Sequence, residues 1–307
     1  MQRKIIYFIN PVSGTKNKAS AVKIIEQRTQ QLNIPYEILD TNAQGDYHFL
    51  KEKIDQEGFT DIVICGGDGT VSQVAASLIE EDVSIGIIPM GSGNGLALAA
   101  KIPRDVNKAL DVIFTGKPGY IDSFFINDTF SCMLCGLGFD AQVAHDFARE
   151  PTRGLGTYIK KSIENFITAK PYSFEIINKG KSFAADAFFI SIANANQFGN
   201  QFTIAPKASL NDGLLDIVVV KKMSKLRMLL AVARQITAGK INEHSEKTFH
   251  EKDVLYFQTS HLIIHNLQQA PLHIDGDPAN TAKKIIIKII PQAFKLIQPL
   301  SEISKPK

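Results

Sequence analysis

The 307-residue sequence has few cysteines, little net charge and no long apolar run. Three cysteines are too few for a disulfide framework, and the first residues do not resemble a secretory leader, so we expect a reducing, cytoplasmic location. No run of about 18 or more apolar residues occurs, which predicts that no helix spans a membrane. A net charge of +3 is too small to predict a nucleic-acid partner.

Three patterns with a familiar chemical meaning are better explained as ordinary structure. The C-x-x-C of Cys132 and Cys135 lies in an alternating run at 129–135 that is predicted to be one strand, which would place the two thiols on opposite faces. The G-x-G-x-x-A pattern at 136–141 is not part of a βαβ unit, so a dinucleotide site is not favoured there. The seven histidines show no ligand spacing. We therefore predict no metal, redox or dinucleotide chemistry from these patterns.

The composition is that of a globular protein, with 44% hydrophobic and 21% charged residues, and the length predicts two domains. In the first third, apolar runs at 5–9, 36–39, 61–65 and 85–89 alternate with amphipathic, helical stretches. This alternation predicts a parallel sheet with helices on both faces. Beyond about Tyr120, strand-like runs dominate and predict a second, mainly antiparallel β domain.

Three polar, glycine-containing loops follow strands of the predicted parallel sheet. They are N-P-V-S-G at 10–14, G-G-D-G-T at 66–70 and P-M-G-S-G-N-G at 89–95. Such loops meet at the carboxyl edge of the sheet, where glycines let the backbone approach a phosphate and the next helix offers free N–H groups. An aspartate in the second loop, Asp68, suggests a metal contact or a general base beside that phosphate.

These three loops, in this order and spacing, resemble the catalytic domain of the diacylglycerol, sphingosine and ceramide kinase superfamily. The resemblance continues through G-F-D at 138–140, R-G-L-G at 153–156, N-D-G-L-L-D at 211–216 and D-G-D at 275–277, so it covers nearly the whole chain. The P-loop pattern and the protein-kinase motifs are absent, which excludes those two routes to phosphoryl transfer.

The resemblance implies a Rossmann-like α/β domain followed by an antiparallel β-sandwich, with ATP bound between them. The nucleotide-binding domain is expected at residues 1–122, with 293–307 returning to it, and the lipid-substrate domain at 123–292. The residues matched to nucleotide binding are Asn10, Ser13, Gly67, Gly69, Thr70, Gly91, Ser92 and Asn94.

The resemblance also implies a set of catalytic, metal and substrate residues. Asp68, Asp275 and Asp277 are the candidate catalytic acids, and Arg153 is expected to reach toward the phosphates. Asp140 resembles the acid that meets the substrate head group in sphingosine kinases. The expected Mg²⁺ ligands are Asp68 and Asp277 for the phosphates, and Asp212 and Asp216 where some bacterial members hold a structural Mg²⁺.

Two details leave the chemistry open. The family usually ends its late motif in D-G-E, but this chain has D-G-D, whose last side chain is one methylene shorter. The general base therefore stays undecided among Asp68, Asp275 and Asp277. In addition, the G-S-G-N loop is the form found in sphingosine and ceramide kinases, which tilts the substrate slightly toward sphingoid bases.

The prediction is an ATP- and Mg²⁺-dependent lipid kinase acting on a lipid at a membrane surface, with diacylglycerol or a related glycerolipid narrowly ahead of a sphingoid base. The alternatives are an NAD kinase, which shares the G-G-D-G-T loop, and a catalytically weak nucleotide- or lipid-binding regulator. The basic, amphipathic stretch at 221–234 could contact an anionic inner-membrane face, although an ordinary packed helix is favoured. Peripheral membrane contact and a homodimer both stay open.

Overall fold

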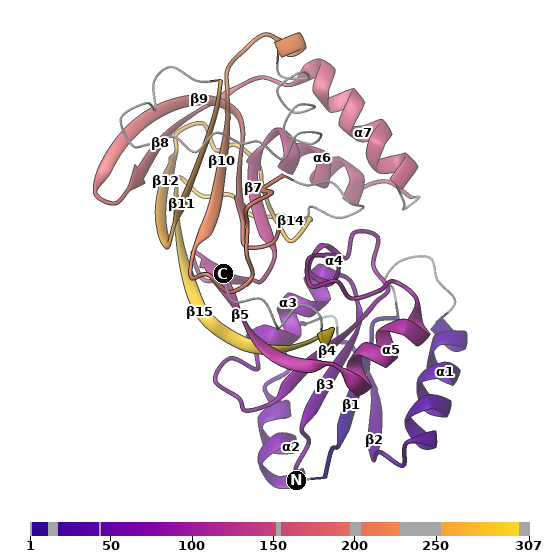
Figure 1. Cartoon of the computed structure of the whole chain (residues 1–307). Coiled ribbons are helices and arrows are strands. Elements are labelled where there is room, and N and C mark those ends of the chain that lie inside the picture. The colour runs from indigo at the N-terminus through magenta and orange to yellow at the C-terminus, as the bar shows by residue number, and fades with distance from the viewer. Residues whose placement is uncertain are drawn as a thin grey trace.

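The computed structural model describes residues 2–11, 18–42, 44–151, 155–196, 204–227 and 253–300. Figure 1 shows two domains, an α/β domain at the amino terminus and a second domain built mainly of strands. Within the described residues, no helix is long and apolar enough to cross a membrane.

The first domain is a parallel sheet with the strand order β2-β1-β3-β4. Strands β1 and β3 are buried along their whole length, as expected for runs of branched apolar residues covered on both faces. The edge strand β2 is only half buried. The strands are β1 (Ile5–Ile9), β2 (Tyr36–Asp40), β3 (Asp61–Gly66) and β4 (Ser84–Pro89), and the helices are α1 (Lys18–Gln31), α2 (Phe49–Glu57), α3 (Asp68–Ala76), α4 (Gly95–Ala99) and α5 (Val106–Thr115).

The second domain is antiparallel; some of its strands alternate between a buried and a more exposed face, and others are buried along almost their whole length. In β12, for example, Leu262 and Ile264 are fully buried, whereas His261 is exposed. This alternation places one face of the strands on a second apolar core. The elements are β7 (Leu134–Gly138), α6 (Phe139–Ala148), α7 (Leu155–Thr168), β8 (Tyr172–Asn178), β9 (Lys181–Ala193), β10 (Leu215–Lys221), β11 (Val254–Thr259), β12 (His261–Asn266), β13 (Leu272–Ile274) and β14 (Asp277–Ala279).

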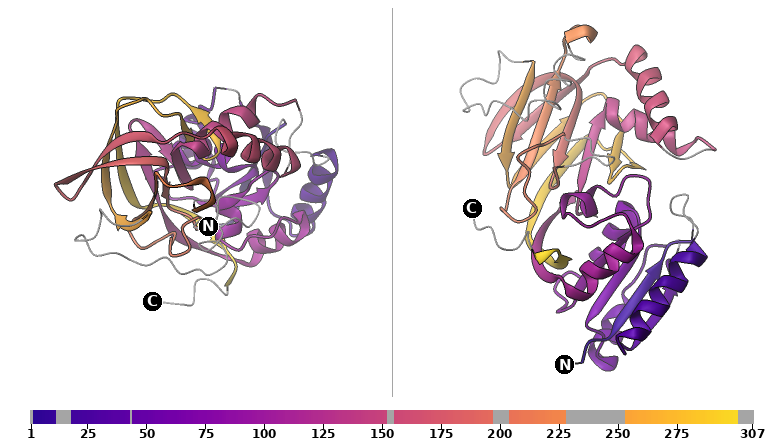
Figure 2. Two further views of the ribbon diagram at one scale, coloured as in Figure 1. Left: turned by 90° about the horizontal axis from the view of Figure 1, so that it is seen from above. Right: turned by 45° about the vertical axis from the view of Figure 1, so that its right-hand side comes forward.

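Two long strands join the domains. β5 (Lys117–Ile126), which also pairs with the short β6 (Thr129–Ser131), runs antiparallel to β15 (Lys284–Gln298), and β15 in turn pairs in parallel with β4. Figure 2 shows β15 running from the second domain into the first. The register of β5 and β15 shifts between Ile290 and Phe294, where the buried Asp122 accepts the N–H of Gln292 (2.8 Å) and of Gly213 (2.7 Å). One hydrogen-bonded sheet thus connects the two domains.

The predicted fold class, α/β followed by antiparallel β, is confirmed. One predicted strand was wrong: the run 129–135 is broken into β6 and β7 at Cys132 and Met133. The break has a tertiary cause, because the N–H of Cys132 donates to Ser72 (3.2 Å) and the N–H of Met133 donates to Asp275 (3.2 Å). Cys132 and Cys135 are both buried free thiols. Strand β8 was not predicted, although its alternating burial follows a regular apolar pattern.

Candidate active site

The second and third glycine loops pack backbone against backbone. The loops follow β3 and β4, which are neighbours, and the N–H of Met90 donates to the carbonyl of Gly66 (2.9 Å). A Cβ added at Gly91 would lie 2.5 Å from the Cα of Gly67. No larger residue fits there without separating the loops, so the glycines at these two positions serve a close approach of two backbones.

Asp68 fastens the second loop to the third. It is the first residue of α3 and is 8% exposed, and its two carboxylate oxygens accept the N–H groups of Gly95 (2.9 Å) and Leu96 (3.0 Å) at the start of α4. Burial raises the pKa of Asp68; those two N–H groups act against the rise, and the nearby charge of Asp277 adds to it. Asp68 therefore positions α4, and its predicted contact with a metal stays a prediction.

Two asparagines complete the junction of the loops. The Asn10 side chain donates to the Thr70 hydroxyl (2.7 Å), which joins the end of β1 to the start of α3. Asn94, at φ 58°, accepts the N–H of Gly91 (2.8 Å) and donates to the carbonyl of the same residue (2.7 Å). Ser92 stands exposed at the tip of the third loop. The predicted nucleotide residues within the described parts of the chain thus lie at one edge of the parallel sheet.

The second domain brings one acid, Asp277, to this edge. Asp277 begins β14, and Figure 1 shows β14 on the side of the second domain that faces α4. A Cβ added at Gly69 would clash with Oδ2 of Asp277, so this carboxylate lies directly against the first turn of α3. The first N–H groups of a helix have no partner within the helix and carry partial positive charge. Asp277 is an exposed residue, so this contact between the two domains lies at the surface of the molecule.

Asp275, two residues earlier, faces the interior. It accepts hydrogen bonds from the Ser131 hydroxyl (2.8 Å), the N–H of Met133 (3.2 Å), the N–H of Leu134 (3.1 Å) and the Ser72 hydroxyl. Burial raises the pKa of Asp275 to about 6, against the opposing effect of these donors. The two acids of the D-G-D motif therefore have different environments: Asp275 ties the turn to α3 and to the β6–β7 connection, and Asp277 reaches the glycine loop.

Asp140 lies in the first turn of α6 in the second domain and is 8% exposed. Its Oδ1 accepts the N–H of Ala141 (2.8 Å), and its Oδ2 lies 3.4 Å from Nε2 of the buried His273. Helix α6 also contacts β14, so Asp140 belongs to the same side of the second domain as Asp277. Its predicted contact with a lipid head group stays a prediction.

The two acids expected at a structural Mg²⁺ differ in exposure. Asp212 is exposed and accepts the N–H of Leu214 (3.1 Å), whereas Asp216 is fully buried and accepts from Gln258 (3.1 Å). In the part of the chain that the structure describes, no three or more His, Cys, Asp or Glu residues are grouped to hold a metal ion. Ser13 and Arg153, also predicted, lie outside the described residues.

Sequence reasoning missed three buried polar residues that organise the site: Ser72, Asp122 and His273. Ser72 contacts both Asp275 and Cys132, Asp122 holds the β5–β15 irregularity, and His273 lies against Asp140. None belongs to a motif of its own. For His273, the only signal in the sequence was its place two residues before the D-G-D motif.

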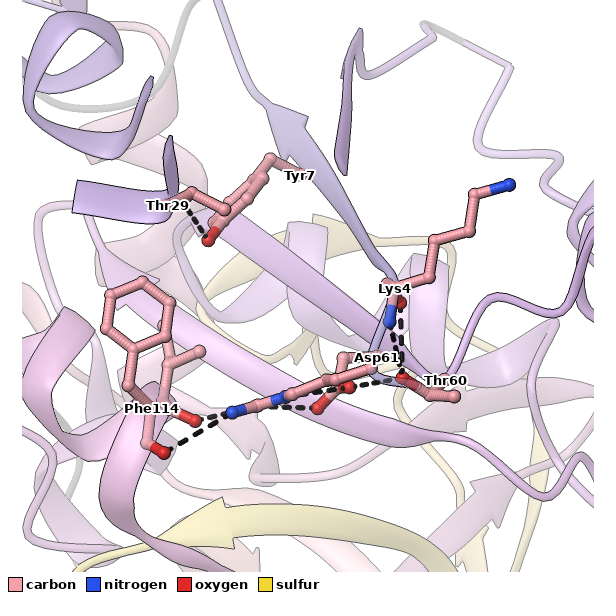
Figure 3. Close-up of polar contacts among 8 residues, drawn as sticks. Lys4, Tyr7, Thr29, Thr60, Asp61 and Phe114 are labelled. Carbon is pink, nitrogen blue, oxygen red and sulfur yellow. Dashed lines mark hydrogen bonds and ion pairs between the residues drawn. The ribbon is translucent and has the colours of Figure 1, made fainter. Parts of the chain in front are cut away.

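A cavity of about 270 Å³ lies at the opposite, amino edge of the parallel sheet, where β3 and β4 begin. Arg3 there forms an ion pair with Asp61 (2.7 Å) and donates to the carbonyl of Ile113 (2.6 Å). Figure 3 shows Asp61 and Thr60 in one polar network with Lys4 and the carbonyl of Phe114. No predicted site residue lines this cavity, which is lined by Arg3, Thr60, Asp61, Ser84, Gly116, Pro118 and Ile297.

Comparison with known proteins agrees with this geometry. Residues 4–126 match the family described as "Diacylglycerol kinase catalytic domain", and residues 134–298 match the "YegS C-terminal NAD kinase beta sandwich-like domain". The chain is 28% identical over 280 residues to "Diacylglycerol kinase" of Bacillus subtilis strain 168, covering 89% of each chain. It is 27% identical over 248 residues to the "Probable lipid kinase YegS-like" protein of Shewanella frigidimarina, covering 78% of this chain and 76% of that protein.

Solved structures show the same fold. The crystal structure of a diacylglycerol kinase from Bacillus anthracis strain Sterne superimposes with a TM-score of 0.73 at 18% sequence identity, covering 97% of this chain and 98% of that one. A second structure from the same organism reaches a TM-score of 0.79 at 21% identity with the same coverage. At this level of identity, the likeness establishes the architecture of both domains together.

Proposed function

Because the chain belongs to the family that joins a diacylglycerol kinase catalytic domain to a YegS-type C-terminal domain, we propose that it transfers the γ-phosphate of ATP to a lipid hydroxyl. The observation that carries this proposal is the contact of Asp277 with Gly69. It brings an accessible carboxylate of one domain onto the glycine loop of the other, where a triphosphate would bind.

The nucleotide side of the site consists mainly of backbone. Gly67, Gly69 and Gly91 leave the loops without side chains, and the first turn of α3 offers N–H groups to phosphate oxygens. Asp68 and Asn94 hold the loops in place through the hydrogen bonds described above. In phosphoryl transfer, the protein contributes mainly by positioning the groups and stabilising charge, and a site preorganised by loop-to-loop contacts suits that requirement.

The residues present fit a divalent cation. A carboxylate at the start of α3 would repel a bound triphosphate unless a cation lay between them, and carboxylate and phosphate oxygens are the ligands that Mg²⁺ prefers. Asp277 is the residue placed to hold the ion, with Asp68 within electrostatic reach of it. When bound, Mg²⁺ would neutralise charge on the transferred group.

We assign the contact with the reacting groups to Asp277 rather than to Asp275. Asp275 already accepts from four donors and is buried, so its oxygens are committed to the turn. Asp277 is exposed at the nucleotide loop, where its carboxylate can orient the lipid hydroxyl and accept its proton. The shorter aspartate, in place of the usual glutamate, is then matched by the close contact of β14 with Gly69.

For the substrate, we propose a glycerolipid of the diacylglycerol type ahead of a sphingoid base. The relatives named as diacylglycerol kinases support this choice, while the G-S-G-N loop is the feature that speaks for sphingoid bases. The second family match is described as NAD kinase-like, so NAD is kept as a competing acceptor.

The test is ADP release by purified protein with ATP and Mg²⁺, with diacylglycerol, sphingosine, ceramide or NAD offered separately, the lipids in mixed micelles. Turnover with diacylglycerol that depends on Mg²⁺ and disappears in Asp277→Asn supports the proposal. Turnover with sphingosine changes the substrate class, and turnover with NAD alone overturns the lipid assignment. ATP binding without turnover on any acceptor would instead indicate a regulator.

A further inference from the structure

A fully buried histidine, His273, lies in β13, close to Asp140 and to the D-G-D turn that carries Asp277. Its neighbours Leu272 and Ile274 face the apolar core, so the ring of His273 lies on the other side of the strand, toward α6. A buried imidazole is costly unless its polar nitrogens meet polar groups. The contacts of the two ring nitrogens therefore indicate why a histidine occupies this position.

One nitrogen faces the D-G-D turn. Nδ1 of His273 accepts the N–H of Gly276 at 3.3 Å. Asp275 (φ 51°) and Gly276 (φ 86°) both have left-handed backbone conformations, which for the aspartate needs support from the surroundings. As an acceptor, Nδ1 carries no proton, so the neutral ring has its proton on Nε2.

The other nitrogen faces Asp140. Nε2 of His273 lies 3.4 Å from Oδ2 of Asp140, and both side chains are buried. A Cβ added at Gly136 would lie 2.5 Å from Nε2 and would clash with Oδ2 of Asp140. The side chains of Asp140 and His273 thus fill the space beside Gly136 that any larger residue would occupy. The contact therefore involves three elements: β7, α6 and β13.

We propose that His273 is a positioning residue that sets Asp140 and Asp277 in a fixed relation to each other. Its ring joins Asp140 on one side to the turn on the other, and the turn delivers Asp277 to Gly69 of the nucleotide loop. The inference rests on the proposed function to the extent that Asp140 and Asp277 contact lipid and phosphates. The structural connection itself does not depend on the substrate.

His145 provides a matched control. It also ties α6 to β13, because its Nε2 lies 2.8 Å from the carbonyl oxygen of Leu272. If His273 only holds the helix on the strand, His145→Asn and His273→Asn should have similar consequences. If His273 acts through Asp140, the loss of activity in His273→Asn should depend on the presence of Asp140, and the loss in His145→Asn should not.

The first experiment is independent of activity. Long-range ¹⁵N–¹H NMR of histidine-labelled full-length protein reports which ring nitrogen carries the proton. We expect the His273 ring to show protonated Nε2 in the wild type, and its Nε2 chemical shift to move in Asp140→Asn, while His145 is unchanged. A ring with protonated Nδ1, or one insensitive to Asp140, would overturn the proposal even if the protein proves to be an active lipid kinase.

The second experiment is a double-mutant cycle on kcat with the lipid that the wild type accepts. His273→Asn keeps an acceptor near the Nδ1 position but loses the contact with Asp140, and His273→Gln keeps a donor near the Nε2 position but loses the contact with Gly276. Each should lower kcat about tenfold, which corresponds to about 1.4 kcal/mol of lost positioning free energy in the transition state. In an Asp140→Asn background, His273→Asn should have no further effect, while His273→Gln should still lower kcat.

Equal losses from His273→Asn in both backgrounds, or the same pattern from His145→Asn, would reduce His273 to a structural residue. Thermal unfolding of each variant controls for misfolding. A wild type without turnover on any lipid would count against the proposed function, whereas the NMR result would still decide the inference about His273.

Discussion

The two edges of the parallel sheet use polar residues in opposite ways. At the amino edge, Arg3 and Asp61 satisfy each other, and Arg3 also donates to backbone carbonyls, in a network that ties β1, β3 and α5 together (Figure 3). At the carboxyl edge, Asp68 and Asn94 hold loops, while the exposed Asp277 lies against Gly69 in the first turn of α3. Polar groups buried with their partners stabilise the fold, whereas an exposed carboxylate beside the glycine loop can also contact a ligand. Substitutions at the two edges should therefore separate activity from stability.

The sharpest test of this difference is Asp277→Asn. We expect kcat to fall by about 10²–10⁴-fold, because an amide neither accepts the proton of the lipid hydroxyl nor offsets the charge of Mg²⁺. The free energy of unfolding should change little, because the side chain is exposed. Steady-state kinetics and urea unfolding measure the two effects. Asp128→Asn, an exposed aspartate in the same domain, is the control and should change neither. A large loss of stability in Asp277→Asn would remove the distinction between the edges.

Gly91→Ala tests the close approach of the two loops. The added methyl would lie 2.5 Å from the Cα of Gly67, so the loops must separate and the phosphate site must distort. We expect kcat/KM for ATP to fall by about 10²-fold, as for a misplacement of catalytic groups by about 1 Å. Gly156→Ala is the matched control, because nothing lies within 4 Å of its added Cβ, and in α7 it should stabilise the fold by up to about 1 kcal/mol. Wild-type kinetics in Gly91→Ala would show that the loops tolerate separation.

Asp275 belongs to the carboxyl edge but resembles the amino edge in being fully satisfied. Its pKa is raised to about 6, so the folded state binds more protons than the unfolded state between about pH 4 and 6. The stability of the wild type relative to Asp275→Asn should therefore be greatest near pH 4 and decline as pH rises to about 6, by at most about 3 kcal/mol. Urea unfolding of both proteins across this range measures it. A relative stability that rises with pH would mean that the four donors outweigh burial.

The smallest effect is expected from Arg3→Met at the amino edge. Removing the guanidinium leaves the nearly buried Asp61 without its cation, which should cost about 1–2 kcal/mol of unfolding free energy because Arg3 is itself partly exposed. Kinetic constants should stay at wild-type values. Arg28→Met, which breaks an ion pair with the exposed Asp111, is the control and should cost less than about 1 kcal/mol. A change in kcat for Arg3→Met would connect the two edges.

Local sequence patterns were sufficient for the first domain. Apolar runs followed by glycine loops predicted β1, β3 and β4, because parallel strands covered on both faces are rich in apolar residues; the half-buried edge strand β2 was predicted from its shorter apolar run. The second domain was harder to predict. Strand β8 was overlooked, and the run 129–135 was taken as one strand, because its break depends on Ser72 and Asp275, which lie far away in the sequence. Long-range hydrogen bonds of this kind leave no periodic signal.

The candidate site likewise has a part that could be predicted from the sequence and a part that could not. The three loops and the D-G-D turn were recognisable as motifs, because backbone approach to phosphate demands glycine at set positions. The burial and the hydrogen-bond partners of each acid could not be predicted from these motifs. Asp68 was predicted to meet a metal, and that stays a prediction; the structure adds that it accepts two backbone N–H groups of α4.

The sequence by itself indicated the order of the domains and the loops that form the edge of the site, since these depend on local composition and spacing, and the resemblance of its motifs indicated the family. Only the tertiary structure decided which acid of the D-G-D motif is buried and which reaches the nucleotide loop. The partners that separate them come from distant segments: Ser72 meets Asp275 across 203 positions, and Gly69 meets Asp277 from the other domain. A carboxylate's pKa and accessibility depend on the groups packed around it, and folding alone brings those groups together.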